Sequence, residues 1–197
     1  MPKLIIFDIG GVLISYGEEK YAAYISKKYG IQYKKFIGVL NRYLPVLELG
    51  NERTSSVLKR LARQLGLTES ELEWGKAFRL LAKPNSDVIN LANRLARKYK
   101  LVLLTNMSFS RYKEARALLK GVRYRRIFAS CYMHMRKPSK QIYLHLLKEM
   151  HAKPSEALFV DNLAENVAGA SRVGIRALRF VTYKTLVKDL KKLGVVA

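Results

Sequence analysis

The chain has 197 residues, of which 49% are hydrophobic and 26% are charged, and this composition excludes a mostly disordered or low-complexity protein. The length fits one large domain, or one core with a small insert. A count of 37 Lys and Arg against 15 Asp and Glu gives a formal net charge of +22, which attracts anionic partners but says nothing about the fold.

The first predicted element is a strand at residues 4–7, and a long helical region follows it. The run Leu-Ile-Ile-Phe is continuously apolar, as in strands that are covered on both faces of a parallel sheet. Residues 15–83 have helical periodicity and no strand signal, and we expect about four helices there. Within this region, residues 58–65 carry an apolar helix face, and Thr68 with Glu71 has the capping-box spacing that predicts the start of another helix.

The second half of the chain alternates between helix and strand. Three helical stretches and three apolar runs follow one another, and we predict helices and strands in turn at residues 88–96, 101–104, 142–150, 157–160, 166–172 and 177–181. Pro138 suits the first turn of the middle helix. This alternation predicts an α/β fold with a doubly wound, Rossmann-like parallel sheet.

Polar side chains follow three of the predicted strands directly. Asp8, Thr105 and Asp161 come straight after the first three apolar runs. Open parallel α/β sheets place their active sites at the carboxyl ends of the strands. The sequence therefore predicts a site at this edge of the sheet.

The residues near these positions suit phosphoryl transfer. Gly10 and Gly11 follow Asp8 and place its carboxylate on a tight turn, but a carboxylate attacks phosphorus only when the repulsion between two anions is removed. Lys137 supplies a cation that can neutralise the phosphoryl charge. Asp161 and the Asn162 amide offer the hard oxygen ligands that Mg²⁺ prefers. The Thr105 hydroxyl and the backbone N–H groups around Asn106 can hold phosphate oxygens.

Four short motifs follow one another along the chain. They are FDIGGVL at residues 7–13, LTN at 104–106, RKP at 136–138 and FVDN at 159–162, with Asn166 after the last. In this order and at these separations they resemble the motifs of the haloacid dehalogenase superfamily of phosphohydrolases. The stretch at residues 48–51 looks like the acidic-Leu-Gly stretch of that superfamily's helical caps, and residues 83–85 look like the return from cap to core. The resemblance implies an α/β core at residues 1–14 and 84–197 and an inserted all-helical cap at residues 15–83.

The same resemblance implies a role for each motif residue. Asp8 is the nucleophile that forms an aspartyl-phosphate, and Lys137 is the second catalytic residue. The implied ligands of Mg²⁺ are Asp8, the Gly10 carbonyl, Asp161 and Asn162. The implied binders of the substrate phosphate are Thr105, Asn106 and Lys137. Asn166 is expected to support the site, and the implied activity is a Mg²⁺-dependent phosphatase acting on a small phosphorylated metabolite.

One position departs from the pattern of the superfamily. Its phosphatases usually carry a second aspartate two residues after the nucleophile, and Gly10 stands there in this chain. Removing a positioned general acid–base lowers the rate by about 10²–10⁴. Tyr16, Glu18 or Glu48 could take over the proton transfer, or the substrate could have a leaving group that needs no proton. The alternative is a non-catalytic module that binds phosphate groups or nucleic acid.

The basic stretch at residues 94–126 leaves two interpretations open. Eleven Lys and Arg residues there accompany one acidic residue, Glu114, and aromatic residues such as Phe109 and Tyr112 are interleaved with them. Such a pattern can bind a nucleic-acid backbone and stack bases. A uniformly basic, solvated surface produces the same pattern, and on the sequence alone we favour it.

We expect a soluble cytoplasmic protein that has no contact with the membrane. No apolar run approaches the ~20 residues that span a bilayer, and the apolar start lacks a small-residue cleavage site. The single cysteine, Cys131, excludes an internal disulfide and is expected to be a small buried residue. The oligomeric state cannot be read from the sequence.

Overall fold

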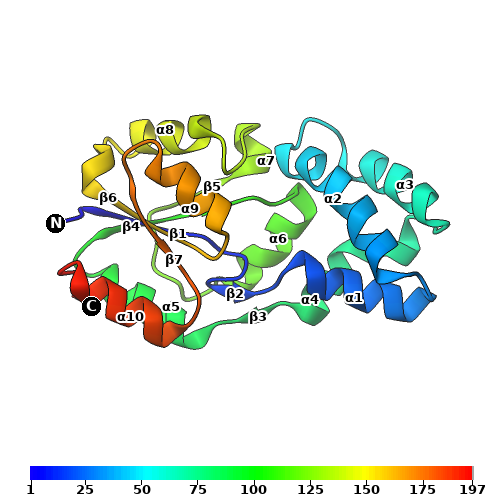
Figure 1. Ribbon diagram of the computed structural model, residues 1–197, viewed down its shortest axis with the longest axis horizontal. Helices are drawn as coiled ribbons and strands as arrows, with labels where there is room; N and C mark the ends of the chain where they lie inside the picture. The colour runs from blue at the N-terminus through cyan, green and yellow to red at the C-terminus, as the bar shows by residue number, and fades with distance from the viewer. Residues whose placement is uncertain (197) are drawn as a thin grey trace.

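The computed structural model describes residues 1–196, and a five-stranded parallel sheet forms its centre (Figure 1). The strand order is β5-β4-β1-β6-β7, with the strands at Leu4–Phe7 (β1), Lys100–Thr105 (β4), Arg126–Ala129 (β5), Ala157–Asp161 (β6) and Arg176–Arg179 (β7). Since β1 pairs with β4 on one side and β6 on the other, the chain winds outward from the middle in both directions. The predicted doubly wound α/β fold is confirmed.

Helices cover both faces of the sheet (Figure 1). Alternate residues of β1 belong to two separate apolar clusters: Leu4 and Ile6 pack with the helices at Lys140–Glu149 (α8) and Ala164–Ser171 (α9). Ile5 and Phe7 belong to the cluster that contains Ser86–Leu95 (α5) and Tyr183–Lys192 (α10). Burial on both faces explains why the strand sequences are continuously apolar instead of alternating.

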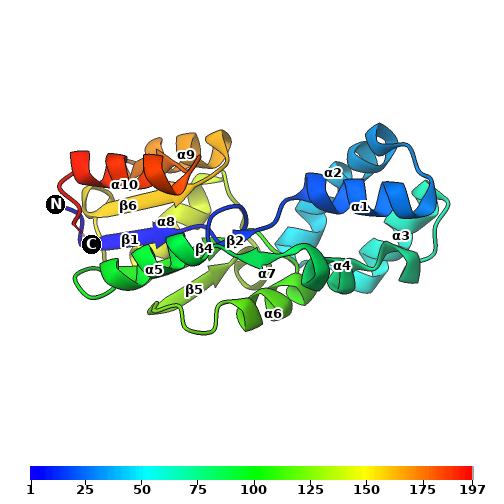
Figure 2. The same cartoon turned by 90° about the horizontal axis from the view of Figure 1, so that it is seen from below.

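Four further helices form the end of the molecule that lies away from both termini (Figure 2). They are Glu18–Tyr29 (α1), Tyr33–Leu49 (α2), Thr54–Leu65 (α3) and Trp74–Leu81 (α4). The chain enters this helical group through Ile14–Ser15 (β2) and leaves it through Lys83–Pro84 (β3), and these two short strands pair antiparallel. Between residues 1 and 196, no helix is both long and apolar enough to cross a lipid bilayer.

The structure corrects the sequence predictions at both ends of this helical group. Residues 15–83 were predicted to lack strands, yet Ser15 and Lys83 pair with one another across β2 and β3.

The Thr68–Glu71 capping box forms, with the Thr68 N–H donating to the carboxylate at 2.7 Å. It opens only a 3₁₀ turn, Ser70–Leu72 (η1), because Glu73 adopts a left-handed conformation that stops the helix.

Two further corrections concern the sheet half of the chain. Pro138 lies before α8 and not in its first turn, because the helix begins at Lys140. The last strand ends at Arg179 instead of residue 181, since its partner β6 ends at Asp161. The sequence analysis also missed β5, the helix Phe109–Leu118 (α6) and the short helix Ser130–Met133 (α7). Cys131 on α7 is buried, as predicted.

Candidate active site

Three charged side chains meet at the carboxyl edge of the sheet. Asp8 follows β1, Asp161 ends β6, and Lys137 precedes α8. The Lys137 Nζ donates to Asp8 Oδ1 at 2.8 Å, to Asp161 Oδ2 at 2.7 Å and to the Leu104 carbonyl at 3.2 Å. The three donors of the ammonium group therefore all have acceptors. The cluster lies where the chain diverges to the two sides of β1, the place where doubly wound sheets bind ligands.

This cluster is buried and carries an excess of negative charge. The side chains of Lys137 and Asp161 are 1% and 0% exposed, and that of Asp8 is 8% exposed. Burial raises the pKa of the Asp8 carboxyl above its usual range, Lys137 opposes the rise, and Asp161 adds to it. Burial by itself would lower the pKa of Lys137, but the two carboxylates outweigh it and raise that pKa. One ammonium faces two carboxylates, so the cluster attracts a further cation.

Asn166 and the start of α9 hold Asp161 in place. The Asn166 Nδ2 donates to both carboxylate oxygens, at 3.1 and 3.0 Å, and the Leu163 N–H donates to Oδ1 at 2.8 Å. The Tyr143 hydroxyl in turn donates to the Asn166 carbonyl at 2.8 Å. These hydrogen bonds fix the direction of the Asp161 carboxylate. Asn166 thus supports the site, as its motif position suggested.

Asn106 uses its side chain to position Lys137. The Lys137 N–H donates to Asn106 Oδ1 at 2.9 Å, and Asn106 Nδ2 donates to the Lys137 carbonyl at 3.0 Å. This pair of bonds ties the loop after β4 to the loop before α8. The side-chain amide of Asn106 is therefore committed to the protein, while Asn106 and Thr105 both line the cavity described below.

The two glycines in the turn after Asp8 differ in the room that they leave for a side chain. Gly11 has a φ of 78°, and a Cβ added there would lie 2.5 Å from the Asn162 side-chain nitrogen, so only glycine fits. A Cβ added at Gly10 would meet nothing within 4 Å. The Asn162 Oδ1 is buried and has no hydrogen-bond partner. The tight turn thus packs the Asn162 side chain, with its unpartnered oxygen, against Gly11.

These donors suit magnesium. Two carboxylates, a buried unpartnered amide oxygen and the Gly10 carbonyl are oxygen ligands, which Mg²⁺ takes together with water. Across residues 1–196, no three His, Cys, Asp or Glu side chains gather as a metal cluster.

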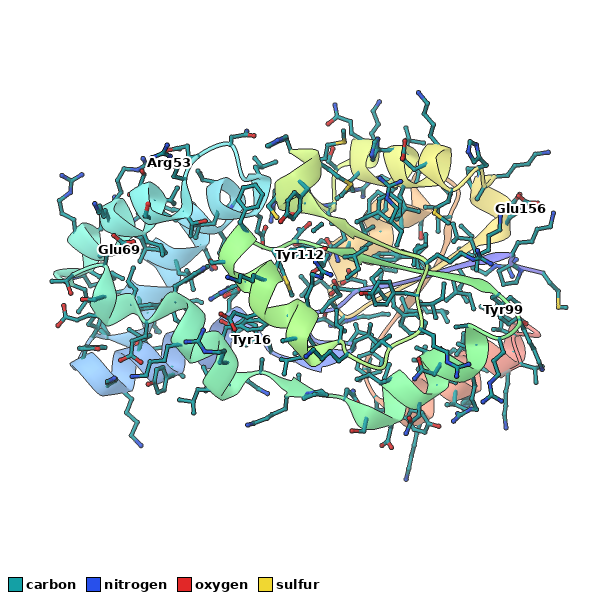
Figure 3. All side chains as sticks on the ribbon, turned by 180° about the vertical axis from the view of Figure 1, so that it is seen from behind. Tyr16, Arg53, Glu69, Tyr99, Tyr112 and Glu156 are labelled. Carbon is teal, nitrogen blue, oxygen red and sulfur yellow. The ribbon has the colours of Figure 1, made fainter. Side chains whose placement is uncertain are left out.

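A cavity of about 710 Å³ opens over the cluster, between the sheet edge and the helical group. All the predicted site residues line it except Asp161, whose carboxylate is hydrogen-bonded to Lys137 and does not line the cavity. The opposite wall comes from α1, α2 and α4, and it mixes apolar side chains such as Leu44, Leu47 and Phe78 with polar ones such as Glu18, Asn41 and Glu48. Tyr16 marks the junction between the two parts of the molecule (Figure 3). A ligand in this cavity would meet the charged cluster at one end and a mixture of apolar and acidic side chains at the other.

Arg111 on α6 lines the same cavity, and the sequence analysis did not identify it. It is 3% exposed, and its Nη1 lies 2.8 Å from both carboxylate oxygens of Glu18 on α1. Its guanidinium carbon is 3.4 Å from the centroid of the Trp74 ring, which places the two groups in stacking contact. The Nε and Nη2 atoms are buried without partners. The one sequence signal is its spacing of four residues from the buried Ala115, on the inward face of α6.

The three candidate replacements for the missing acid also line the cavity. The Tyr16 hydroxyl is buried without a partner, and burial raises the pKa of this group above its usual range. Glu18 is bound by Arg111. Glu48 accepts from Arg136 at 2.9 and 2.8 Å, and burial raises the pKa of its carboxyl although Arg136 opposes the rise.

Comparison with known proteins identifies relatives over nearly the whole chain. The family model for haloacid dehalogenase-like hydrolases matches residues 2–174. A sesquiterpene phosphatase of Aspergillus oryzae is 26% identical over 197 residues, covering 97% of this chain and 96% of that protein. A flavin mononucleotide hydrolase of Arabidopsis thaliana is 34% identical over 68 residues, which cover 34% of this chain and 28% of that protein.

Solved structures share the same fold. A predicted HAD-like hydrolase from Porphyromonas gingivalis superposes with a TM-score of 0.79 at 24% identity, covering 100% of both chains. A HAD family enzyme from Bacteroides thetaiotaomicron, in complex with magnesium and inorganic phosphate, has a TM-score of 0.74 at 18% identity, covering 91% of this chain and 94% of that one. At these identities the likeness concerns the arrangement of the chain.

Proposed function

The chain belongs to the haloacid dehalogenase-like hydrolases, and on that premise we propose that it is a Mg²⁺-dependent phosphatase of a small phosphorylated metabolite. The observation that carries the proposal is the buried Lys137 ammonium between the Asp8 and Asp161 carboxylates, at the floor of a closed-in cavity. The name of the Aspergillus oryzae relative, a phosphatase that aligns over nearly its whole length, supports the reaction type.

Asp8 is the proposed nucleophile. A carboxylate oxygen of Asp8 attacks phosphorus, the bond from phosphorus to the ester oxygen breaks, and an aspartyl-phosphate and an alcohol result. Water then attacks the aspartyl-phosphate, which releases inorganic phosphate and restores the carboxylate. Lys137 holds Asp8 Oδ1 and offsets the negative charge of the incoming phosphate, while Thr105 and the backbone at Asn106 hold phosphate oxygens.

The proposed magnesium ligands are Asp8, Asp161, the Gly10 carbonyl and the Asn162 side-chain oxygen. When bound, Mg²⁺ supplies positive charge that offsets the repulsion between the phosphate and the carboxylate. Asn166 and the Leu163 N–H keep Asp161 directed into the site. The unpartnered Asn162 oxygen gains a partner in this arrangement.

The leaving group receives its proton from the cavity wall or needs none. Gly10 has no acid to offer, and both oxygens of Glu18 lie against Arg111. Glu48 combines a raised pKa with a position on the cavity wall, so we assign it the proton transfer for substrates that require one. Aryl and acyl phosphates do not depend on this step, because their leaving groups are stable as anions.

The proposed division of labour follows from the position of the cavity. Residues 1–14 and 84–197 form the core that carries the chemistry, and residues 15–83 form the cap that closes the cavity and selects the substrate. The apolar side chains that α2 and α4 contribute to the mixed cavity wall favour a substrate whose alcohol has some apolar surface. We keep the cytoplasm as the proposed compartment, since the one cysteine is unpaired.

Phosphate release from p-nitrophenyl phosphate and a panel of phosphometabolites tests the proposal. We expect Mg²⁺-dependent turnover that EDTA abolishes and that Asp8→Asn abolishes with Mg²⁺ present. Asp87→Asn, an exposed aspartate on α5, is the matched control and keeps wild-type turnover. Equal turnover in Asp8→Asn and the control would contradict the assigned nucleophile. A folded wild type that binds Mg²⁺ yet releases no phosphate from any substrate would favour the non-catalytic alternative.

A further inference from the structure

A second groove lies on the outer face of α6 and shares no residue with the active-site cavity. It has a volume of about 780 Å³, and its walls come from α6, the loop that follows it as far as Tyr124, and Tyr132 of α7. Figure 3 looks onto this face, with Tyr112 labelled on α6. The phosphatase site does not account for this groove.

One exposed and three partly buried aromatic rings gather in the groove. Tyr132 is 61% exposed, and its ring centroid lies 5.0 Å from that of Phe109 and 5.2 Å from that of Tyr112, both in edge-on geometry. Tyr124 lines the same groove. Rings packed in this way are held in fixed positions with part of their surface open to solvent, so they can accept a planar ligand at small entropic cost.

The cations of the groove have no protein partners. Lys113, Arg116 and Lys120 are exposed and line it, and among residues 1–196 none of them forms an ion pair with a carboxylate. The neighbouring acid, Glu114, is bonded to Arg79 of α4 at 2.6 Å. No acidic residue lines the groove. Its positive charge is therefore uncompensated.

We propose that this groove binds single-stranded nucleic acid. Backbone phosphates contact the three cations, and unpaired bases stack on the exposed Tyr132 and on the open parts of the partly buried Tyr112 and Tyr124 rings, which is how proteins bind single strands without reading their sequence. Unpaired bases expose the faces that such stacking requires, whereas a duplex hides them. An acidic peptide would use the cations and leave the rings without a role, and a second copy of this chain would bring a like charge of +22.

Fluorescence anisotropy with a fluorescein-labelled 12-nucleotide RNA of mixed sequence tests this proposal on the full chain. We expect Tyr132→Ala to weaken binding about tenfold, through one lost stacking contact. The triple change of Lys113, Arg116 and Lys120 to Gln should lower the slope of log K against log salt by about 2, since each lost phosphate contact removes about 0.7.

A matched charge control separates the groove from the basic surface as a whole. Lys184, Lys188 and Lys191 lie exposed on α10, on the opposite side of the molecule from α6 (Figure 2), and their change to Gln removes the same charge. This variant should bind RNA nearly as tightly as the wild type. The two triple variants should keep the wild-type melting temperature, and Tyr132→Ala should lower it slightly because its ring contacts with Phe109 and Tyr112 are lost. All variants should keep wild-type phosphate release, so failure here leaves the phosphatase proposal intact.

Four outcomes would overturn the inference. They are no binding at low salt, equal weakening in the two triple variants, no effect of Tyr132→Ala, and equal competition by a 12-base-pair duplex or by poly-glutamate. Comparison with the DNA oligonucleotide of the same sequence then shows whether the strand is recognised as RNA, because stacking and phosphate contacts by themselves predict similar affinities.

Discussion

The open space at Gly10 allows the missing acid to be put back. A Cβ at this position meets nothing within 4 Å, so the backbone at Gly10 leaves room for the first atom of an aspartate side chain, two residues after the proposed nucleophile. A positioned general acid–base contributes about 10²–10⁴ in rate, which corresponds to about 3–5 kcal/mol of the activation barrier. This is the upper limit of the gain for alkyl phosphates, whose leaving group must be protonated and for which Glu48 is the proposed donor in the wild type, and we expect little change for aryl phosphates.

The comparison between leaving groups is the informative measurement. We would determine kcat/KM for an alkyl phosphate and for p-nitrophenyl phosphate in the wild type, Gly10→Asp and Gly10→Asn. Asparagine has nearly the same shape as aspartate, but its amide cannot act as a general acid or base. It therefore controls for packing and for local backbone entropy. If the two substrates gained equally in Gly10→Asp, or if asparagine gave the same gain, the proposed role for this position would be wrong.

Three further predictions concern charge. Lys137→Met should lower the free energy of unfolding by about 3–5 kcal/mol, because two buried carboxylates lose their counter-ion; a loss below 1 kcal/mol in urea titration would contradict this. Asn166→Ala should weaken Mg²⁺ binding by about 10–100-fold in calorimetry, since Asp161 loses the amide that orients it, and unchanged affinity would remove Asn166 from the site. Lys28 and two tyrosine hydroxyls lower the pKa of Glu73 to about 2, so its contribution to stability is complete above about pH 4.5 and is lost as the pH falls from there toward 2. In urea midpoints taken from pH 6 to pH 2.5, the difference between wild type and Glu73→Gln should shrink over that window, and a difference that is constant with pH would refute the assignment.

Three of the four predicted strands, β1, β4 and β6, are buried on both faces, whereas the fourth, the edge strand β7, is only partly buried. Residues 4–7 and 157–160 are apolar throughout because helices cover both sides, and that pattern stands out in the sequence. The edge strand β5 gave no such signal, since Arg126 is exposed and Ile127 is only partly covered. The two-residue strands β2 and β3 are too short to have any periodicity, and their pairing depends on the return of the chain from α4.

Helix α6 was missed for a related physical reason. Its outer face carries Tyr112 and Lys113, and its inner face carries the buried Arg111, so apolar and polar residues do not segregate at the helical period. Arg111 therefore reads as one more residue of a basic stretch. The burial of this arginine cannot be predicted from the sequence, because its partner Glu18 lies on a helix far away in the sequence and only the fold brings the two together.

The position of Asp8 in the sheet bears on the order in which the protein is made. Leu4 of the central strand pairs with Lys100 on one side and Ala157 on the other, so β1 has no partner until much later parts of the chain exist. During synthesis, Asp8 is made before Lys137, Asp161 and Asn166, and its site cannot form until they follow. A chain that stops before Asn166 therefore cannot assemble the site, and the Asp8 carboxylate becomes functional only after that residue has been made.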